Sequence, residues 1–145
     1  MSAFNGMNIS SSGMSAQRLR MDVISQNIAN VNTTRDENGN PYKRRAVVYA
    51  EKDSTPFQEV FMRTTGVAGS GVKVTQIVED RKTAMRKVYD PSHPDSDDDG
   101  YVTYPNVNIV QEMTDLIDAT RSYEANVTAF NATKNMALKG LDVGK

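Results

Sequence analysis

The residues best suited to chemistry lie in one short acidic stretch, Asp95–Gly100. Asp95, Asp97 and Asp99 alternate and Gly100 follows, which matches the opening of a calcium-binding loop. In such a loop alternate carboxylates converge on one ion and a glycine allows the sharp bend. The twelfth position, where a bidentate glutamate is needed, is Asn106. We therefore expect an exposed acidic turn without a metal, and a calcium-binding interaction module is the alternative function.

No catalytic arrangement can be read from the sequence. The chain has no cysteine, which excludes thiolate catalysis, disulfides and cysteine metal sites. Its one histidine, His93, lies between a serine and a proline. General acid–base work needs at least one such group, but the spacing places no nucleophile or orienting acid beside it. We expect a protein that is not an enzyme and that binds no cofactor.

The charge and hydropathy of the chain limit the kinds of partner that it is expected to bind. The 145 residues carry a formal net charge of -1, so a nucleic-acid partner is not expected. The basic clusters 43–45, 81–82 and 86–87 either pair with acidic residues of a partner or another subunit, or are simply solvated. No apolar run is long enough for a membrane span. The first eight residues lack the basic and apolar regions of a secretory signal, which predicts the cytoplasm or a route that bypasses that signal.

The last third of the chain predicts one long helix, Ile109–Leu141. Neither glycine nor proline interrupts it between Pro105 and Gly140, and at 1.5 Å per residue it is about 50 Å long. Residues recur at steps of four and three, the spacing of a coiled-coil seam, so the helix needs a partner along its length. The expected seam is Ile109, Met113, Leu116, Thr120, Tyr123, Val127, Phe130, Lys134, Ala137 and Leu141.

Residues 1–34 predict a second helix that carries only three charges, on Arg18, Arg20 and Asp22. A serine at 10–12 is expected to cap its start, and the run Asn30–Thr33 to end it. A helix this uncharged depends on packing, either in the core of a small bundle or, as its amides favour, among neighbouring chains.

The segment between the helices is rich in predicted strands. Phe57–Arg63 is either a strand or a loop, and Asp90–Asn108 is expected to be a loop, with Asn106 or Asn108 near the cap of the long helix. The expected strands are Tyr42–Ala50, Val72–Glu79 and Met85–Tyr89.

These patterns predict an α+β fold in which the N- and C-terminal helices pair as a coiled coil and hold a small strand-rich insert between them. The expected division is 1–34 and 106–145 for the two helices of an inner coiled-coil domain, and 35–105 for the insert.

Two stretches carry a resemblance. The string Ser25–Thr33 (SQNIANVNT), with Ser15, Ala16 and Leu19 upstream, resembles the N-terminal signature of bacterial flagellar rod and hook proteins. Tyr101–Asn126, followed by Lys134, Asn135 and Met136, is similar to their C-terminal signature. The short chain and the string Tyr89–Asp95 (YDPSHPD) narrow the resemblance to the proximal-rod members.

The resemblance implies a structural subunit of the basal-body proximal rod, which polymerises through its terminal helices into a helical drive shaft around the export channel. Its partners would be other copies of itself, other rod proteins and the flagellar export apparatus. It would reach the periplasm through that apparatus without a cleaved signal peptide.

Carried over residue by residue, the resemblance and the predicted seam give a set of expected assembly positions. In the first signature they are Asn27, Ile28, Ala29, Asn30, Val31 and Asn32. In the second they are Asn106, Val107, Asn108, Glu112, Met113, Leu116, Arg121, Tyr123, Glu124, Ala125, Asn126, Val127 and Phe130. Thr120 and Lys134, which interrupt the seam, are also expected to contact other subunits, together with Asn126 and Asn131.

Overall fold

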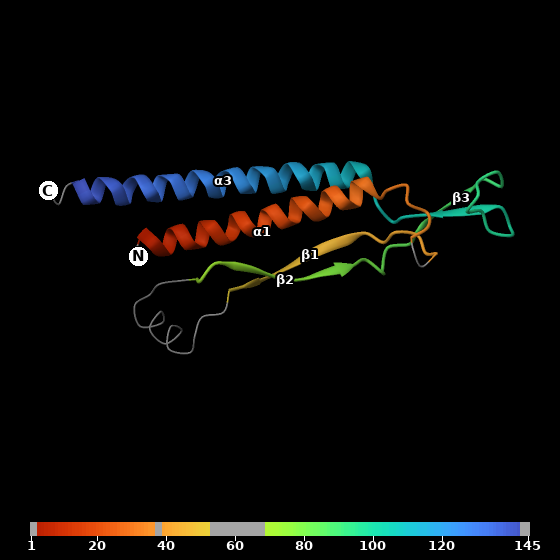
Figure 1. Ribbon diagram of the computed structural model, residues 1–145, viewed down its shortest axis with the longest axis horizontal. Helices are drawn as coiled ribbons and strands as arrows, with labels where there is room; N and C mark the ends of the chain where they lie inside the picture. Colours follow the sequence, from red (N-terminus) through yellow and green to blue (C-terminus); the bar gives the residue numbers. More distant parts are fainter. Residues whose placement is uncertain (1–2, 37–38, 53–68, 143–145) are drawn as a thin grey trace.

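The computed structural model describes residues 3–36, 39–52 and 69–142 and has an elongated shape. Two helices lie antiparallel, so both ends of the chain are at the same end of the molecule (Figure 1). A two-stranded ribbon runs along the first helix, and a second hairpin projects from the opposite end. The described elements are α1 (Ala3–Ala29), β1 (Arg45–Glu51), β2 (Val72–Glu79), β3 (Arg86–Tyr89), β4 (Tyr101–Tyr104) and α3 (Ile109–Asp142). The expected α+β fold with paired terminal helices is confirmed.

Helix α1 begins at Ala3, so the predicted start at Ser10–Ser12 is wrong. Its serines bond backward instead of capping: Ser12 Oγ donates to the carbonyl of Ile9 at 2.7 Å and Ser15 Oγ to that of Ser11 at 3.1 Å. Serine inside a helix satisfies its hydroxyl in this way. The predicted end is confirmed, because α1 stops at Ala29, just before Asn30.

Helix α3 spans 34 residues and confirms the predicted long helix. Asn108 is its cap, since Asn108 Oδ1 accepts hydrogen bonds from the backbone N–H groups of Val110 at 3.0 Å and Gln111 at 3.4 Å. Asn106, the other cap candidate, makes contacts elsewhere.

The two sheets are both antiparallel pairs. Strand β1 pairs with β2 around a bulge at Val48/Tyr49, and this ribbon packs on α1. The prediction of β2 is confirmed at both ends, whereas β1 begins at Arg45, three residues later than expected. The strand predicted at Met85–Tyr89 is β3. The candidate segment Phe57–Arg63 lies outside the described residues.

Strand β4 corrects the prediction of a continuous loop over Asp90–Asn108. It pairs with β3 so that Val88 faces Val102, and the Val102 side chain is fully buried. Gly100, with φ of 79°, ends the intervening loop, and Asp90 N–H bonds to its carbonyl at 2.9 Å. Four residues after a run of aspartate and proline are too few to give an alternating pattern.

The contact between α1 and α3 has the predicted heptad spacing but not all the predicted residues. Leu116, Tyr123, Phe130 and Ala137 are half-buried, as expected. Met113, Thr120 and Lys134 are exposed, and the residue just before each of them is buried or half-buried instead. The observed seam is Glu112, Leu116, Ala119, Tyr123, Asn126, Phe130, Thr133 and Ala137.

Small residues of α1 set how closely the helices approach. A Cβ atom at Gly13 would lie 2.7 Å from Asn126 Oδ1, and one at Gly6 would lie 3.5 Å from Thr133 Cγ2. Asn27 bonds to Glu112 at the far end of the pair. The α1 positions differ by multiples of seven, and so do their partners on α3, which is the repeat of a coiled coil. Within the described ranges, no helix combines the length and apolar character that a membrane span requires.

Candidate assembly interface

A buried polar cluster joins α1, β1 and α3, and Asn27 is at its centre. The side chain is fully buried. Its Nδ2 donates to the carbonyl of Arg45 at 2.8 Å, and its Oδ1 accepts from the Arg45 N–H at 2.9 Å. The amide therefore binds the first residue of β1 as a neighbouring strand would. Tyr42 Oη also donates to Asn27 Oδ1, at 2.9 Å, and burial raises the pKa of this hydroxyl although the Arg45 guanidinium opposes the shift.

Glu112 supplies the negative charge of this cluster. Its carboxylate is fully buried, accepting from Asn27 Nδ2 at 2.9 Å and from Arg44 Nε at 2.6 Å. Asp115, one turn later, accepts from Arg20 Nη2 at 3.0 Å and lies 3.6 Å from Arg44 Nη2. A buried carboxylate is tolerated when it is paired and hydrogen-bonded in this way.

Asn106 fixes the strands to the same region. Its Oδ1 accepts from the Arg44 N–H at 2.9 Å, and its Nδ2 donates to the carbonyls of Asp80 at 3.0 Å and Thr83 at 3.3 Å. Asn27, Asn106 and Glu112, all expected assembly positions, thus have partners inside the chain. Their effect on assembly stays a prediction.

Other expected positions gather where α1 ends and α3 begins. Val31, Asn32, Val107 and Asn108, with Arg86 and Ile109, line a groove of about 440 Å³. Asn32 and Asn108 are exposed, whereas Val31 and Val107 are half-buried. Asn30 is held locally, since its Nδ2 donates to the carbonyl of Gln26. Ile28 is half-buried beside it, and Ala29 is exposed.

The outward side of α3 carries large apolar residues beside this groove. They follow helical spacing and form what we call the outer stripe. It consists of Ile109, Val110, Met113 and Ile117, which are 45%, 74%, 54% and 53% exposed. Val110 and Ile117 were not among the expected positions, although Ile117 follows Met113 by one helical turn.

The expected positions further along α3 divide between seam and surface. Leu116, Tyr123, Asn126 and Phe130 belong to the seam, with Val127 half-buried beside it. The exposed ones are Arg121, Glu124 and Ala125.

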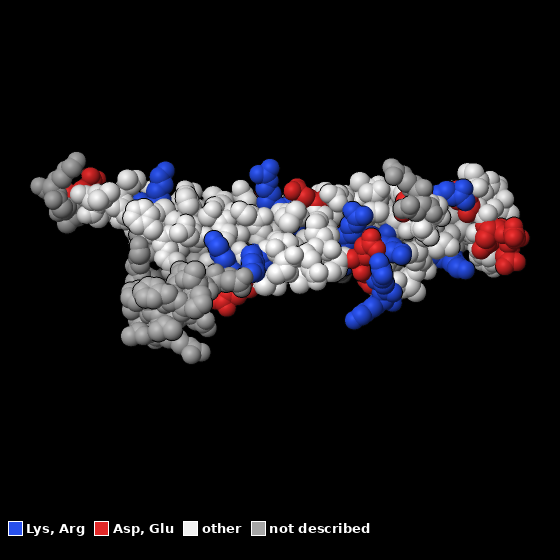
Figure 2. Space-filling model, turned by 60° about the horizontal axis from the view of Figure 1, so that its bottom comes forward, with Lys and Arg blue, Asp and Glu red and all other residues white. Residues whose placement is uncertain are grey.

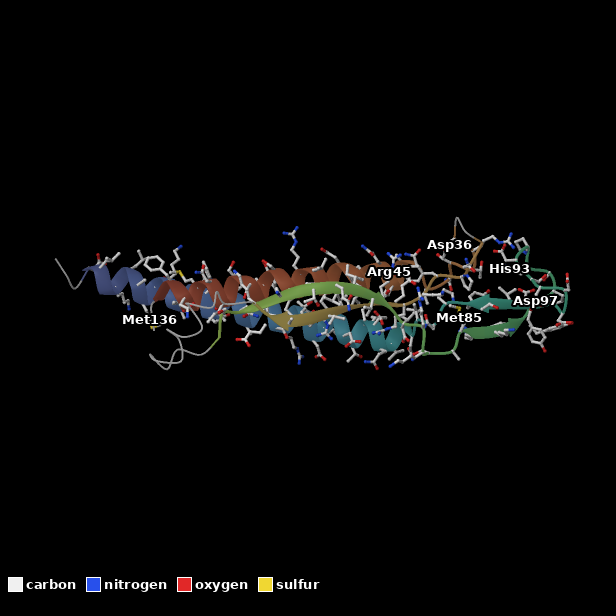
Figure 3. The ribbon with its side chains drawn as sticks, turned by 90° about the horizontal axis from the view of Figure 1, so that it is seen from below. Asp36, Arg45, Met85, His93, Asp97 and Met136 are labelled. Carbon is white, nitrogen blue, oxygen red and sulfur yellow. The ribbon has the colours of Figure 1, made fainter. Side chains whose placement is uncertain are left out.

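The acidic loop lies at the projecting end of the molecule, where Figure 3 places His93 and Asp97. Asp95 accepts from Thr34 Oγ1 at 2.7 Å and pairs with Arg35 at 3.4 Å, while Asp97 Oδ1 accepts from the Tyr101 N–H at 2.7 Å. Asp97 thus stabilises its own turn, whereas Asp95 connects the loop to the segment that follows α1. The described residues contain no group of three histidine, aspartate or glutamate side chains that could hold a metal ion.

Comparisons with known proteins match both ends of the chain. The family described as flagella basal body rod protein matches residues 7–35, and the C-terminal family of the flagellar basal body rod FlgEFG proteins matches residues 98–143. These segments contain most of α1 and all of α3. The class is therefore that of the flagellar rod proteins.

Comparison with curated relatives identifies one family within this class. Flagellar basal-body rod protein FlgC of Bacillus subtilis is 48% identical over the full length of both chains. The FlgC of Borreliella burgdorferi is 43% identical over 99% of this chain and 98% of its own, and that of Salmonella typhimurium is 36% identical over the full length of both. The chain belongs to the FlgC family of flagellar basal-body rod proteins. It is a structural subunit of the rod and not an enzyme.

Proposed function

We propose that this subunit belongs to the proximal rod and polymerises through α1 and α3, with copies of itself and with other rod proteins, into a helical shaft around the export channel. The observation that carries the proposal is the outer stripe, where four large apolar side chains lie exposed along two turns of α3. A row of exposed apolar residues on one side of a helix is typical of a surface that another chain covers.

A matched pair of substitutions tests this use of the stripe. Met113→Asp places a carboxylate in the stripe, and Gln111→Asp places the same group on an exposed position of the opposite flank of α3. Because both positions are exposed, neither change should unfold the chain. We expect Met113→Asp to abolish motility and to remove the chain from isolated basal bodies, and Gln111→Asp to leave both nearly unchanged. Normal motility of Met113→Asp would contradict the proposal.

The expected assembly positions fall into two roles in this proposal. Exposed members such as Met113, Asn32 and Arg121 contact neighbouring subunits directly. Buried members such as Asn27 and Glu112 act by holding the strands in place. The division into an inner helical domain (1–34 and 106–145) and an insert (35–105) is part of the same proposal, although the polar cluster joins the segments tightly.

The proposal also covers delivery: the chain passes through the flagellar export apparatus and joins the rod in the periplasm without losing a signal peptide. Support comes from the family, whose members are basal-body proteins. Mass spectrometry of the chain from isolated basal bodies should find the N-terminal peptide intact, starting at Met1 or Ser2. Recovery of a chain shortened by a cleaved leader would refute this route.

A further inference from the structure

A cavity of about 300 Å³ opens between α1, β1 and α3, and three arginines line it. Arg20 comes from α1 and Asp115 from α3. Arg45 is the first residue of β1, and Arg44 directly precedes it. With Glu112 beside them, three guanidinium groups face two carboxylates. The cavity therefore has a net positive charge even though the whole chain is slightly acidic.

The arginines of the cavity carry more N–H donors than their contacts within the described part of the chain use. A guanidinium carries five N–H donors. Arg20 uses Nη2 for Asp115, and Arg44 uses Nε for Glu112 and Nη2 for Asp115. Arg45 lies over the Tyr42 ring, 5.6 Å from its centroid, and makes no ion pair with a carboxylate among the described residues. An additional acceptor would satisfy these groups.

Tyr49 is a further polar residue at the cavity. Its side chain lines the cavity, and its hydroxyl is buried without a hydrogen-bond partner in the part of the chain described. Because this hydroxyl has almost no accessible surface, an entering carboxylate meets the guanidinium groups first and reaches Tyr49 only if the cavity wall shifts.

The complementary group lies at the far end of the same molecule. Asp97, Asp98 and Asp99 are exposed at the tip of the β3–β4 hairpin, and Figure 2 shows acidic side chains gathered at that end while basic groups lie over the body. The hairpin extends away from the helices, so the tip is remote from the cavity of its own chain (Figure 1).

We propose that the arginine-lined cavity receives the acidic tip, 97–99, of a second copy of this chain. This occupant follows from charge complementarity and from the N–H donors of the arginines that no group among the described residues accepts. The inference rests on the proposed polymerisation. Because tip and cavity are different surfaces, the contact is heterologous, and a repeated heterologous contact that does not close builds an open helical array. Charged contacts of this kind chiefly fix register and suppress wrong partners.

Cross-linking can test the contact directly, because the chain has no cysteine of its own. Ala46→Cys places a thiol in the cavity without removing an arginine, and Asp98→Cys places one at the tip. Two alleles, one with each change, are expressed together in a strain that lacks the unmodified gene, and isolated basal bodies are treated with a short bismaleimide. We expect a covalent dimer of the chain. Gln76→Cys, exposed on β2, replaces Ala46→Cys as the matched control and should give little dimer.

Charge dependence provides the second measurement. In the Ala46–Asp98 pair, Arg45→Glu should lower the dimer yield about tenfold, the effect of losing one charge-assisted hydrogen bond on a binding constant. Arg18→Glu makes the same charge change at an exposed position of α1 and should leave the yield unchanged. Two results would overturn the contact and leave the proposed function standing. In one, rods contain the cysteine variants but give no more dimer than the Gln76 control. In the other, the dimer yield responds equally to both arginine changes. Absence of the unmodified chain from isolated rods overturns the proposed function, and the contact with it.

Discussion

The two sides of α3 differ in the kind of residue they carry, and the outward side is more apolar than is usual for a helix surface. A helix of a soluble protein normally turns its large apolar residues inward. Here every second seam position facing α1 is small or polar, whereas the outer stripe is apolar. The small or polar inward residues are Glu112, Ala119, Asn126 and Thr133, which alternate with Leu116, Tyr123, Phe130 and Ala137. The outward ones are Ile109, Val110, Met113 and Ile117.

Each side suits a different partner. The inward side pairs with α1 through close approach at Gly13 and through the hydrogen bond between Asn27 and Glu112. Such contacts fix one register, because a shift of one turn would separate every donor from its acceptor. The outward side offers apolar area without hydrogen bonds of its own, which suits a surface buried by another subunit. Under the proposed function, the chain uses the mixed polar and apolar contacts of the seam to define its own shape and the apolar outer stripe to join its neighbours.

The largest effect should follow from removing the charge on the inward side. Glu112→Ala leaves Asn27 Nδ2 without this acceptor and Arg44 without its closest carboxylate. Breaking a buried pair costs about 3–5 kcal/mol, and because Arg44 is partly exposed we expect a loss of about 3 kcal/mol in the free energy of unfolding. Urea unfolding followed by far-UV circular dichroism measures it. Glu112→Gln keeps an acceptor for Asn27 Nδ2 but removes the charge, and it should lose less than Glu112→Ala. A Glu112→Gln variant as stable as the unchanged chain would argue against the ion pair.

A pair of glycines gives the next effect. Gly13→Ala places a Cβ 2.7 Å from Asn126 Oδ1, whereas Gly6→Ala meets Thr133 at an ordinary 3.5 Å. Both changes gain helix propensity, about 1 kcal/mol, but overpacking at Gly13 costs about 1–3 kcal/mol. We expect Gly13→Ala to be less stable than Gly6→Ala by about 2 kcal/mol in the same urea titration.

A second substitution distinguishes overpacking from a general intolerance of alanine at this position. Asn126→Ala removes the atom that the new methyl group would meet. Adding it to Gly13→Ala should recover most of the loss, and no recovery would show that Asn126 does not set the distance between the helices.

The sequence predicted the elements better than their contacts. Both helices, strand β2 and the heptad spacing follow from periodicity, which depends on residues close in the chain. The seam was placed half correctly, because a search for apolar spacing finds Leu116 and Tyr123 but passes over Glu112 and Ala119. These two are buried by a partner more than 80 residues away in the sequence, which local pattern cannot show.

The polar cluster was the part that residue pattern could not predict. The flagellar signatures named Asn27, Asn106 and Glu112 as important, but nothing local indicates that one asparagine binds the backbone of Arg45 and another that of Arg44. The early start of α1 was missed for a related reason. Serines at 10–12 are typical caps, and only the packing of α1 on α3 and on the ribbon makes a longer helix favourable.

The smallest effect on stability should come from the outward side, which makes the contrast between the two sides measurable. Ile117→Asn replaces a side chain that is 53% exposed, and isoleucine and asparagine have similar helix propensities. The free energy of unfolding should therefore change by less than about 0.5 kcal/mol, as for most surface substitutions. The same variant should enter isolated basal bodies poorly, because the apolar area offered to a neighbour is reduced. A loss of unfolding free energy near that of Glu112→Ala would instead place Ile117 in the packing of its own chain, and the outer stripe would no longer be a surface kept for assembly.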